Sequence, residues 1–188
     1  MSVRTPRVVT WLAAAALLAL AVPVVIACVI PRTLSEQMKM AGDEVVVGTV
    51  QSFKEVTTAD ADGHQVLWTV VDFRADESLV SGKKAFDVRF FFVGGVAPGS
   101  PSTSITPSPD DIRAGRKLLL FLAKRPFGEA AFGPGALKLD SYAECYRLFE
   151  VTDQGQTRRV VLGKGNGFAF TDNVTVDVAR ARVAEAKK

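Results

Sequence analysis

The sequence predicts a mainly β domain with a short N-terminal helix and a C-terminal helix. Several stretches alternate apolar and polar residues, as half-buried strands do, and helix-capping residues precede two segments with helical periodicity. If an N-terminal leader of 27 residues is set aside, 161 of the 188 residues remain. A chain of that length is sufficient for one domain with its own core.

The first 27 residues have the pattern of an export signal. Arg4 and Arg7 form a positive start, and an apolar run over residues 11–26 follows them. Small Ala27 directly precedes Cys28, as at a signal-peptidase cleavage site. These features predict that residues 1–27 are a signal peptide of the lipoprotein type and that residues 28–188 form a single exported domain.

The residues at this boundary leave three alternatives open. The stretch Val25-Ile26-Ala27-Cys28 resembles the bacterial lipobox, in which the cysteine thiol receives a diacylglycerol and becomes the first residue of the mature lipoprotein. The second alternative is cleavage without a lipid. The third is an uncleaved anchor, because the 20 residues 11–30 could span a bilayer at about 1.5 Å per residue. All three place the domain outside the cytoplasm, either attached to the cell envelope or secreted.

The charge of the chain argues against a nucleic-acid partner. The sequence holds 23 basic and 20 acidic residues, and two of the basic ones, Arg4 and Arg7, lie in the signal peptide. Among the remaining 21 basic residues, the only clusters are short pairs such as Lys83-Lys84, Arg116-Lys117 and Arg158-Arg159, whereas nucleic-acid binding needs a concentrated cationic face.

The two cysteines offer mutually exclusive roles for one sulfur atom. If Cys28 is acylated, Cys145 is left as a lone thiol. If Cys28 is not acylated, a Cys28–Cys145 disulfide is expected in an oxidising compartment. A bridge across so long a loop could stabilise the fold by about 4–5 kcal/mol, less any strain.

Capping signals mark a helix at each end of the domain. Thr33 and Glu36 form a capping box that predicts a helix over Leu34–Ala41. Near the C-terminus, Thr175 is expected to cap a helix over residues 176–187. Its side chains facing the domain would be Val176, Ala179 and Val183.

Period-two alternation predicts the strands between these helices. The first strand begins at Asp43, and Gly48 within it suggests a bulge. Val45, Val47 and Phe53 are expected on one face of this strand, and Val46 and Val50 on the other. Further strands are expected over residues 65–74 and 84–92, and in a hairpin of residues 146–151 with 159–162. Residues 116–123 are a continuous apolar run and are expected to form a central strand covered on both faces.

Two loops are the expected binding elements. The loop of residues 94–111 is long and rich in Gly, Pro, Ser and Thr, so it is either disordered or functional. The loop of residues 126–135 is shorter and exposes Phe127 and Phe132, which would pack against the domain or against a partner.

The residues predict no catalytic constellation. His64 is the only histidine, and it lies in an Asp-Ala-Asp-Gly-His stretch whose composition suits a hairpin turn. The aspartates of this stretch lack the other ligands of an EF-hand. We therefore expect no metal, no cofactor and no enzymatic activity.

Four stretches resemble the bacterial exported domains that are similar to the tissue inhibitors of metalloproteinases. They are residues 27–31 (ACVIP), the helix Leu34–Ala41, residues 43–50 (DEVVVGTV) and residues 113–122 (RAGRKLLLFL). The resemblance covers about residues 28–150 and implies a five-stranded netrin-like OB-fold barrel. It also implies a role for Cys28, since the N-terminal cysteine of that family chelates the zinc of a metalloprotease. Ile30 stands where the family has a second cysteine.

These observations predict a non-enzymatic, exported and lipid-anchored binding or assembly module of the bacterial cell envelope. Its partners would be the membrane, through the lipid anchor or the N-terminal segment, and a protein. One alternative is a secreted metalloprotease inhibitor that uses the free N-terminus of Cys28. A second is an enzyme with an unrecognised site near residues 94–111.

Overall fold

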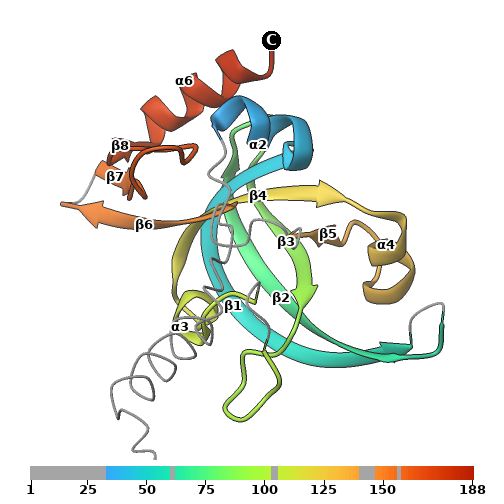
Figure 1. Cartoon of the computed structure of the whole chain (residues 1–188). Helices are drawn as coiled ribbons and strands as arrows, with labels where there is room; N and C mark the ends of the chain where they lie inside the picture. The colour runs from blue at the N-terminus through green and yellow to red at the C-terminus, as the bar shows by residue number, and fades with distance from the viewer. Residues whose placement is uncertain (1–32, 60–61, 103–105, 140–146, 156–157) are drawn as a thin grey trace, which may run out of the picture. The chain divides into compact units, whose positions relative to one another are not determined.

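An eight-stranded sheet organises the part of the chain that the structure describes (Figure 1). The computed structural model describes residues 33–188 except 60–61, 103–105, 140–146 and 156–157. The chain divides into two units, Met1–Ile30 and Pro31–Lys188, and all described residues belong to the second. The strands are β1 (Glu44–Ala59), β2 (Gln65–Ser78), β3 (Lys84–Val93), β4 (Lys117–Lys124), β5 (Leu137–Lys138), β6 (Leu148–Gln154), β7 (Arg158–Val161) and β8 (Val174–Thr175). The helices are α2 (Leu34–Ala41), α3 (Pro109–Ile112), α4 (Pro126–Phe132) and α6 (Val176–Ala186).

Five of these strands form a closed ring. β1 pairs antiparallel with β2 and also with β4, and β2 pairs antiparallel with β3. β5 completes the ring because it pairs with both β3 and β4. The prediction of a mainly β domain is confirmed. The sequence does not predict β5, since two residues are too few to show a period.

The remaining three strands extend from β4 outside the ring. Residues 118–120 of β4 pair with β6, and residues 123–124 of the same strand pair with β5. β7 pairs antiparallel with β6, and β8 pairs antiparallel with β7. The predicted hairpin of β6 and β7 is therefore present, and it forms a side branch of the ring.

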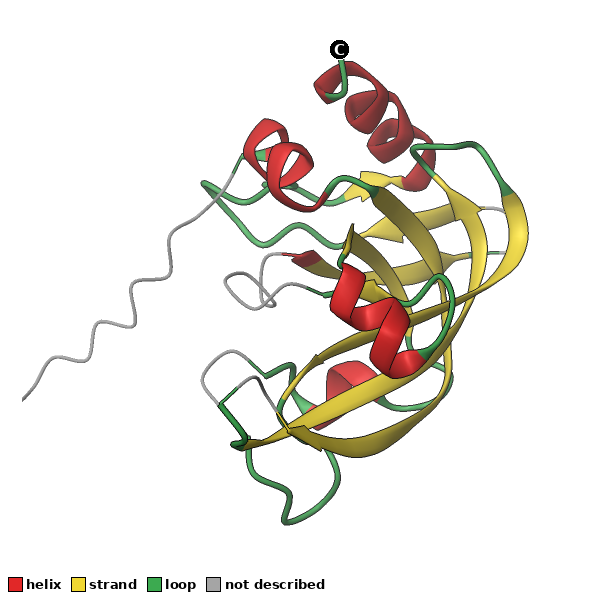
Figure 2. Cartoon of the chain, turned by 90° about the vertical axis from the view of Figure 1, so that its right-hand side faces the viewer, coloured by secondary structure: helices red, strands yellow, loops and turns green. Residues whose placement is uncertain are grey.

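The ring strands bury both of their faces. All five contribute to an inner core, which includes Val46, Phe73, Phe90, Leu120 and Leu137. The outer face of β1 and β4 packs with β6, α2 and α6 in a second core, which includes Val47, Phe121, Phe149, Phe170 and Val183. A third and smaller cluster lies on the outer face of β2 and β3 beneath α4, and Figure 2 looks onto α4 where it crosses these strands.

Both predicted terminal helices are confirmed. In α2, the hydroxyl of Thr33 accepts a hydrogen bond from the Glu36 amide, and the Glu36 carboxylate accepts one from the Thr33 amide at 2.8 Å. This reciprocal pair satisfies amides that the first helical turn leaves without partners. In α6, the hydroxyl of Thr175 caps the amide of Val178. Its predicted inward residues, Val176, Ala179 and Val183, are all buried.

A bulge in β1 reverses the expected orientation of Phe53. The pairing with β2 shifts register at Val47/Gly48 and again at Val50/Ser52. The second shift adds one residue to β1, so Phe53 faces Val71 and shares the face of Val50. The predicted face of Phe53 is therefore wrong, because an extra residue inverts the alternation of every residue that follows it.

Candidate functional site

Helix α4 occupies the segment that the sequence suggests is a loop. Pro126 stands at the first helical position, where its missing amide costs nothing and its fixed φ suits the helix. The helix ends at Gly133, whose φ of 102° is one that few residues other than glycine adopt. A short segment with proline at one end and glycine at the other is typical of a loop, which is why the sequence predicts one here. The structure corrects this prediction to a helix.

The helix places two phenylalanines on an aromatic cluster. The ring of Phe132 lies 4.7 Å from that of Phe91 and 5.8 Å from that of Trp68, centre to centre. The ring of Phe127 lies 5.3 Å from that of Trp68. The indole of Trp68 donates a hydrogen bond to the hydroxyl of Thr58 at 3.0 Å. Such tilted and edge-on pairs are the favoured arrangements of aromatic rings, so the cluster has one defined packing.

Exposure separates the two predicted binding residues. Phe132 is 7% exposed and Phe91 is fully buried, whereas Phe127 is 44% exposed. Phe132 therefore belongs to the packing of the domain, and Phe127 both packs on Trp68 and faces solvent. The sequence leaves open whether these rings pack against the domain or against a partner. Phe132 packs against the domain.

The remaining outward positions of α4 are also apolar. Pro126, Ala130 and Ala131 are exposed, and the one exposed charge of the helix is Glu129. Phe127, Ala130 and Ala131 are spaced i, i+3 and i+4 and therefore lie on one side of the helix. We call Pro126, Phe127, Ala130 and Ala131 the α4 surface. Val56 and the half-buried Trp68 pack beneath it.

A polar hollow of about 450 Å³ lies beside the turn that follows α4 and is lined there by Pro134 and Gly135. Its charged side chains are paired: Arg89 meets Asp72 at 2.9 Å, and Arg74 meets Asp87 at 2.9 Å. Arg89 also donates to the carbonyl of Phe132 at 3.3 Å, which ties the last turn of α4 to β3. Exposed ion pairs of this kind contribute little free energy, so the hollow supports α4 more than it defines a separate site.

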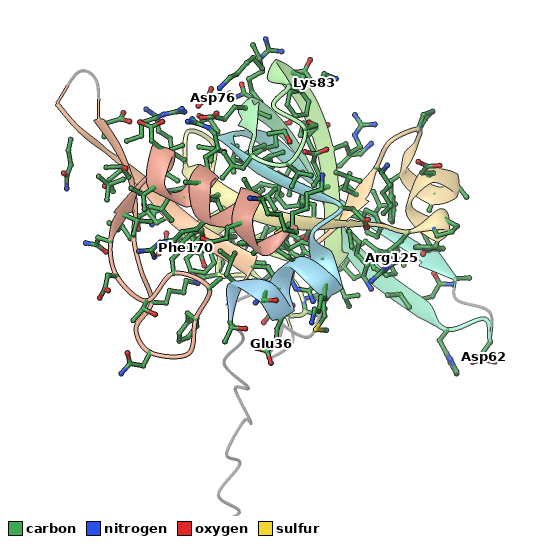
Figure 3. The ribbon with its side chains drawn as sticks, turned by 90° about the horizontal axis from the view of Figure 1, so that it is seen from above. Glu36, Asp62, Asp76, Lys83, Arg125 and Phe170 are labelled. Atoms are coloured by element: carbon green, nitrogen blue, oxygen red, sulfur yellow. The ribbon has the colours of Figure 1, made fainter. Side chains whose placement is uncertain are left out.

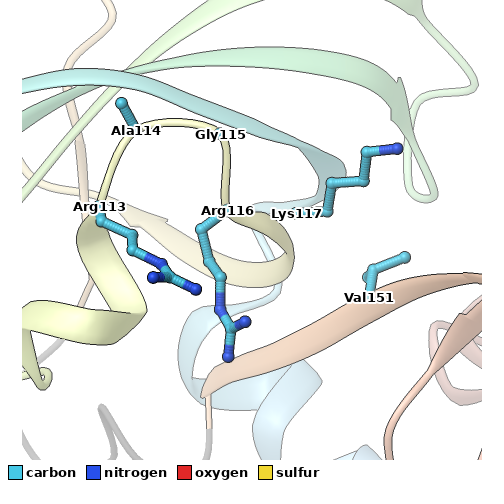
Figure 4. Close-up of a pocket in the computed structure, with 6 residues that line it drawn as sticks. All are labelled: Arg113, Ala114, Gly115, Arg116, Lys117 and Val151. Carbon is cyan, nitrogen blue, oxygen red and sulfur yellow. The ribbon is translucent and has the colours of Figure 1, made fainter.

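A basic hollow of about 380 Å³ lies at the start of β4 (Figure 4). It is lined by Arg113, Arg116 and Lys117 together with Ala114, Gly115 and Val151. Arg116 is paired with Glu150 at 2.8 Å, and Lys117 is paired with Asp153. An incoming anion would have to compete with these two carboxylates, so the hollow is a weaker binding site than its count of basic residues suggests.

The long loop of residues 94–111 is attached to β1 by one carboxylate. Glu55 accepts hydrogen bonds from the amides of Val96 and Ala97, both at 2.8 Å, and from the hydroxyl of Ser100 at 2.5 Å. The Ser100 bond first, and then the amide bonds, hold the pKa of Glu55 below its ordinary value. The hydroxyl of Thr69 also donates to the carbonyl of Gly94 at 2.7 Å. Residues 94–102 therefore have a defined position, in contrast to the expected disorder.

A buried carboxylate joins the C-terminal helix to the ring. Glu77 on β2 is 2% exposed and accepts hydrogen bonds from Arg180 (2.8 Å), Arg159 (2.9 Å) and Lys84 (2.5 Å). Burial raises the pKa of Glu77, but the bonds from Lys84 and Arg180 outweigh burial and lower this pKa. Sequence reasoning missed the cluster because its members are far apart in the chain, Arg180 by 103 positions.

The remaining sequence predictions concern His64, a metal site and the two cysteines. His64 is exposed in the β1–β2 turn, and Figure 3 shows its neighbour Asp62 at the far end of that hairpin. Within the described ranges, no three metal-binding side chains gather in one place. Cys28 and Cys145 both lie outside the described residues, so their lipid and their disulfide stay predictions.

Comparison with protein-family models, with curated proteins and with solved structures finds no match to this chain. Among the described helices, none has the length and hydropathy needed to cross a bilayer. A functional assignment for this chain therefore rests on its own sequence and geometry.

Proposed function

We propose that this chain is a lipid-anchored, non-enzymatic binding module of the bacterial cell envelope, with a netrin-like OB-type barrel as its folded part. A closed ring of five strands with a helix packed outside it supports this fold assignment. The pattern of residues 25–28 supports the anchor, since a small residue directly precedes Cys28.

The observation that carries the binding role is the α4 surface. Four of the five exposed positions of α4 are apolar, and Phe127 is 44% exposed although it packs on Trp68. A surface helix typically presents mostly charged or polar residues to solvent. Exposed apolar surface with a defined aromatic support is typical of a binding site.

Mass spectrometry of the chain purified from bacterial membranes tests the anchor. We expect a mature protein that begins at Cys28 and carries the added mass of a diacylglycerol with its acyl chains. The matched control is Cys28→Ser, which removes the acylated thiol and should leave the protein without lipid. An unmodified Cys28 joined to Cys145 would contradict the proposal and would favour the protease-inhibitor alternative. A full-length chain in the cytosol would contradict both.

A further inference from the structure

The α4 surface is bordered by basic side chains. Lys124 and Arg125 directly precede the helix, with Lys124 exposed and Arg125 partly exposed, and Figure 3 labels Arg125. Lys54 is exposed and pairs in register with Val70, a member of the cluster beneath α4. Because directly opposite residues of two strands share a face, Lys54 lies on the same face as the aromatic cluster.

Fewer acidic groups face this border. Glu129 is the exposed acid of α4. Asp43 lies next to Lys124, where its carboxylate accepts a hydrogen bond from the Lys124 amide at 2.8 Å. The same face also carries the ion pair of Asp72 and Arg89 at 2.9 Å. Four basic groups therefore stand against three acidic ones, and the Asp43 carboxylate is already bonded to the backbone. The border is net positive and surrounds an apolar centre.

The connection between the proposed anchor and the described domain is short. Four residues lie between Cys28 and Thr33, and a fully extended segment of that length reaches at most about 17 Å. If Cys28 carries a lipid, the domain is therefore held near the bilayer, where even a weak contact can form.

The composition of the α4 surface favours a lipid surface over a protein as its occupant. Its apolar centre consists of the ring of Phe127 with Pro126 and two alanines. A stable protein interface buries about 800 Å² on each partner, whereas a small apolar centre with a cationic border suits contact with a lipid surface.

We propose that the α4 surface contacts an anionic phospholipid bilayer, with Phe127 entering the interfacial layer and Lys54, Lys124 and Arg125 facing lipid phosphates. This inference rests on the proposed lipid anchor. Neither one aromatic ring nor three cations would hold a free protein on a membrane for long. An anchor makes the contact intramolecular, so weak binding is sufficient to fix the orientation of the domain.

Trp68 provides the measurement, because the sequence has two tryptophans and the other, Trp11, lies in the proposed signal peptide. The lipidated protein purified from bacterial membranes is reconstituted into vesicles of phosphatidylcholine and phosphatidylglycerol that contain brominated lipid. We expect the brominated lipid to quench Trp68 fluorescence, since this ring lies 5.3 Å from that of Phe127. Quenching should fall by at least half in vesicles of phosphatidylcholine alone, because that lipid gives the bilayer no net negative charge to attract the three basic side chains.

Two substitutions and one matched control complete the test. Phe127→Ser should reduce the quenching at least twofold, and Lys124→Glu should reduce it to a similar extent without altering the aromatic cluster. Val178→Ser is the control, because Val178 is 42% exposed on α6 and lies outside the proposed contact. It should leave the quenching unchanged.

Flotation of the same vesicles separates the two proposals. If the protein does not float with the vesicles, the anchor fails. If it floats but Trp68 is not quenched, or is quenched equally in the Phe127→Ser and Lys124→Glu variants, the membrane contact is wrong. The second outcome would leave a protein as the occupant of the α4 surface.

Discussion

The two outer faces of the ring are covered in different ways. On the α6 side, the inward residues of the helix are apolar and buried, and its exposed positions mix the charged Asp177, Arg182 and Glu185 with Val178 and two alanines. On the α4 side, the inward residue Phe132 is also buried, but Glu129 is the one exposed charge of the helix. Both helices expose apolar side chains, and only α4 exposes an aromatic ring, Phe127. We place binding at α4 because of this difference.

The connections of the two helices differ as well. α6 is tied to the ring by the buried carboxylate of Glu77, which binds side chains from β3, β7 and α6 itself. α4 is held by aromatic packing and by one bond from Arg89 to a backbone carbonyl. The attachment of α6 therefore includes buried ion pairs, whereas that of α4 relies on aromatic packing. Substitutions can test the two kinds of attachment separately.

The largest effect is expected on the α4 side. Phe132→Ala removes a buried ring that contacts both Phe91 and Trp68, and it should lower the free energy of unfolding by about 3–5 kcal/mol. Urea denaturation of the mature chain, followed by the fluorescence of Trp68, measures this loss of free energy. Phe127→Ser is the matched control and should cost well under half as much. Equal losses for the two variants would mean that Phe127 is a packing residue and would remove the contrast between the two sides.

A smaller loss is expected on the α6 side. Glu77→Gln keeps the size of the side chain and removes the charge that Arg180 and Arg159 share. Removing one partner of a buried ion pair typically costs about 3–5 kcal/mol, but these arginines are partly exposed, so water can replace some of the interaction. We expect about 2–3 kcal/mol by thermal or urea denaturation. Asp87→Asn is the control, since Asp87 is 86% exposed, and it should change stability little.

Acid should weaken the fold through two carboxylates. Glu55 and Glu77 both have a folded-state pKa below their ordinary value of 4.5. Each therefore contributes stability that is present above that value and is lost as the pH falls through the lowered pKa. Unfolding free energies measured from pH 6 to pH 3 should decline, and the decline should become shallower in the Glu55→Gln and Glu77→Gln double variant. An unchanged slope in that variant would show that other groups control acid sensitivity.

The sequence predicts the regular parts of this fold because their signals are local. The capping box of Thr33 and Glu36 lies within one helical turn, β3 alternates apolar and polar residues along its length, and β4 is a continuous apolar run. The prediction fails where the determining contact is distant or short. β5 has only two residues, and the bulge that redirects Phe53 becomes visible only in the register with β2.

The candidate site is predictable to a similar degree. An apolar segment with two phenylalanines between glycines identifies residues 126–135 as a place of interest. The helical form of that segment, and the division of Phe127 from Phe132, depend on contacts with Phe91 and Trp68 from other strands. Nothing near Glu77 in the sequence indicates its arginine partners, because Arg159 and Arg180 follow it by 82 and 103 positions.

The packing of α4 also restricts how this protein can vary. A side chain on Gly128 would place its first carbon 2.2 Å from the ring of Phe91, a distance that no rearrangement of one rigid ring inside a filled cluster relieves. Evolution can exchange the exposed alanines of α4 one at a time, but position 128 and its aromatic neighbour must change together or not at all. Homologous chains that keep glycine there while their outward residues diverge would be expected to share the scaffold and differ in what they touch.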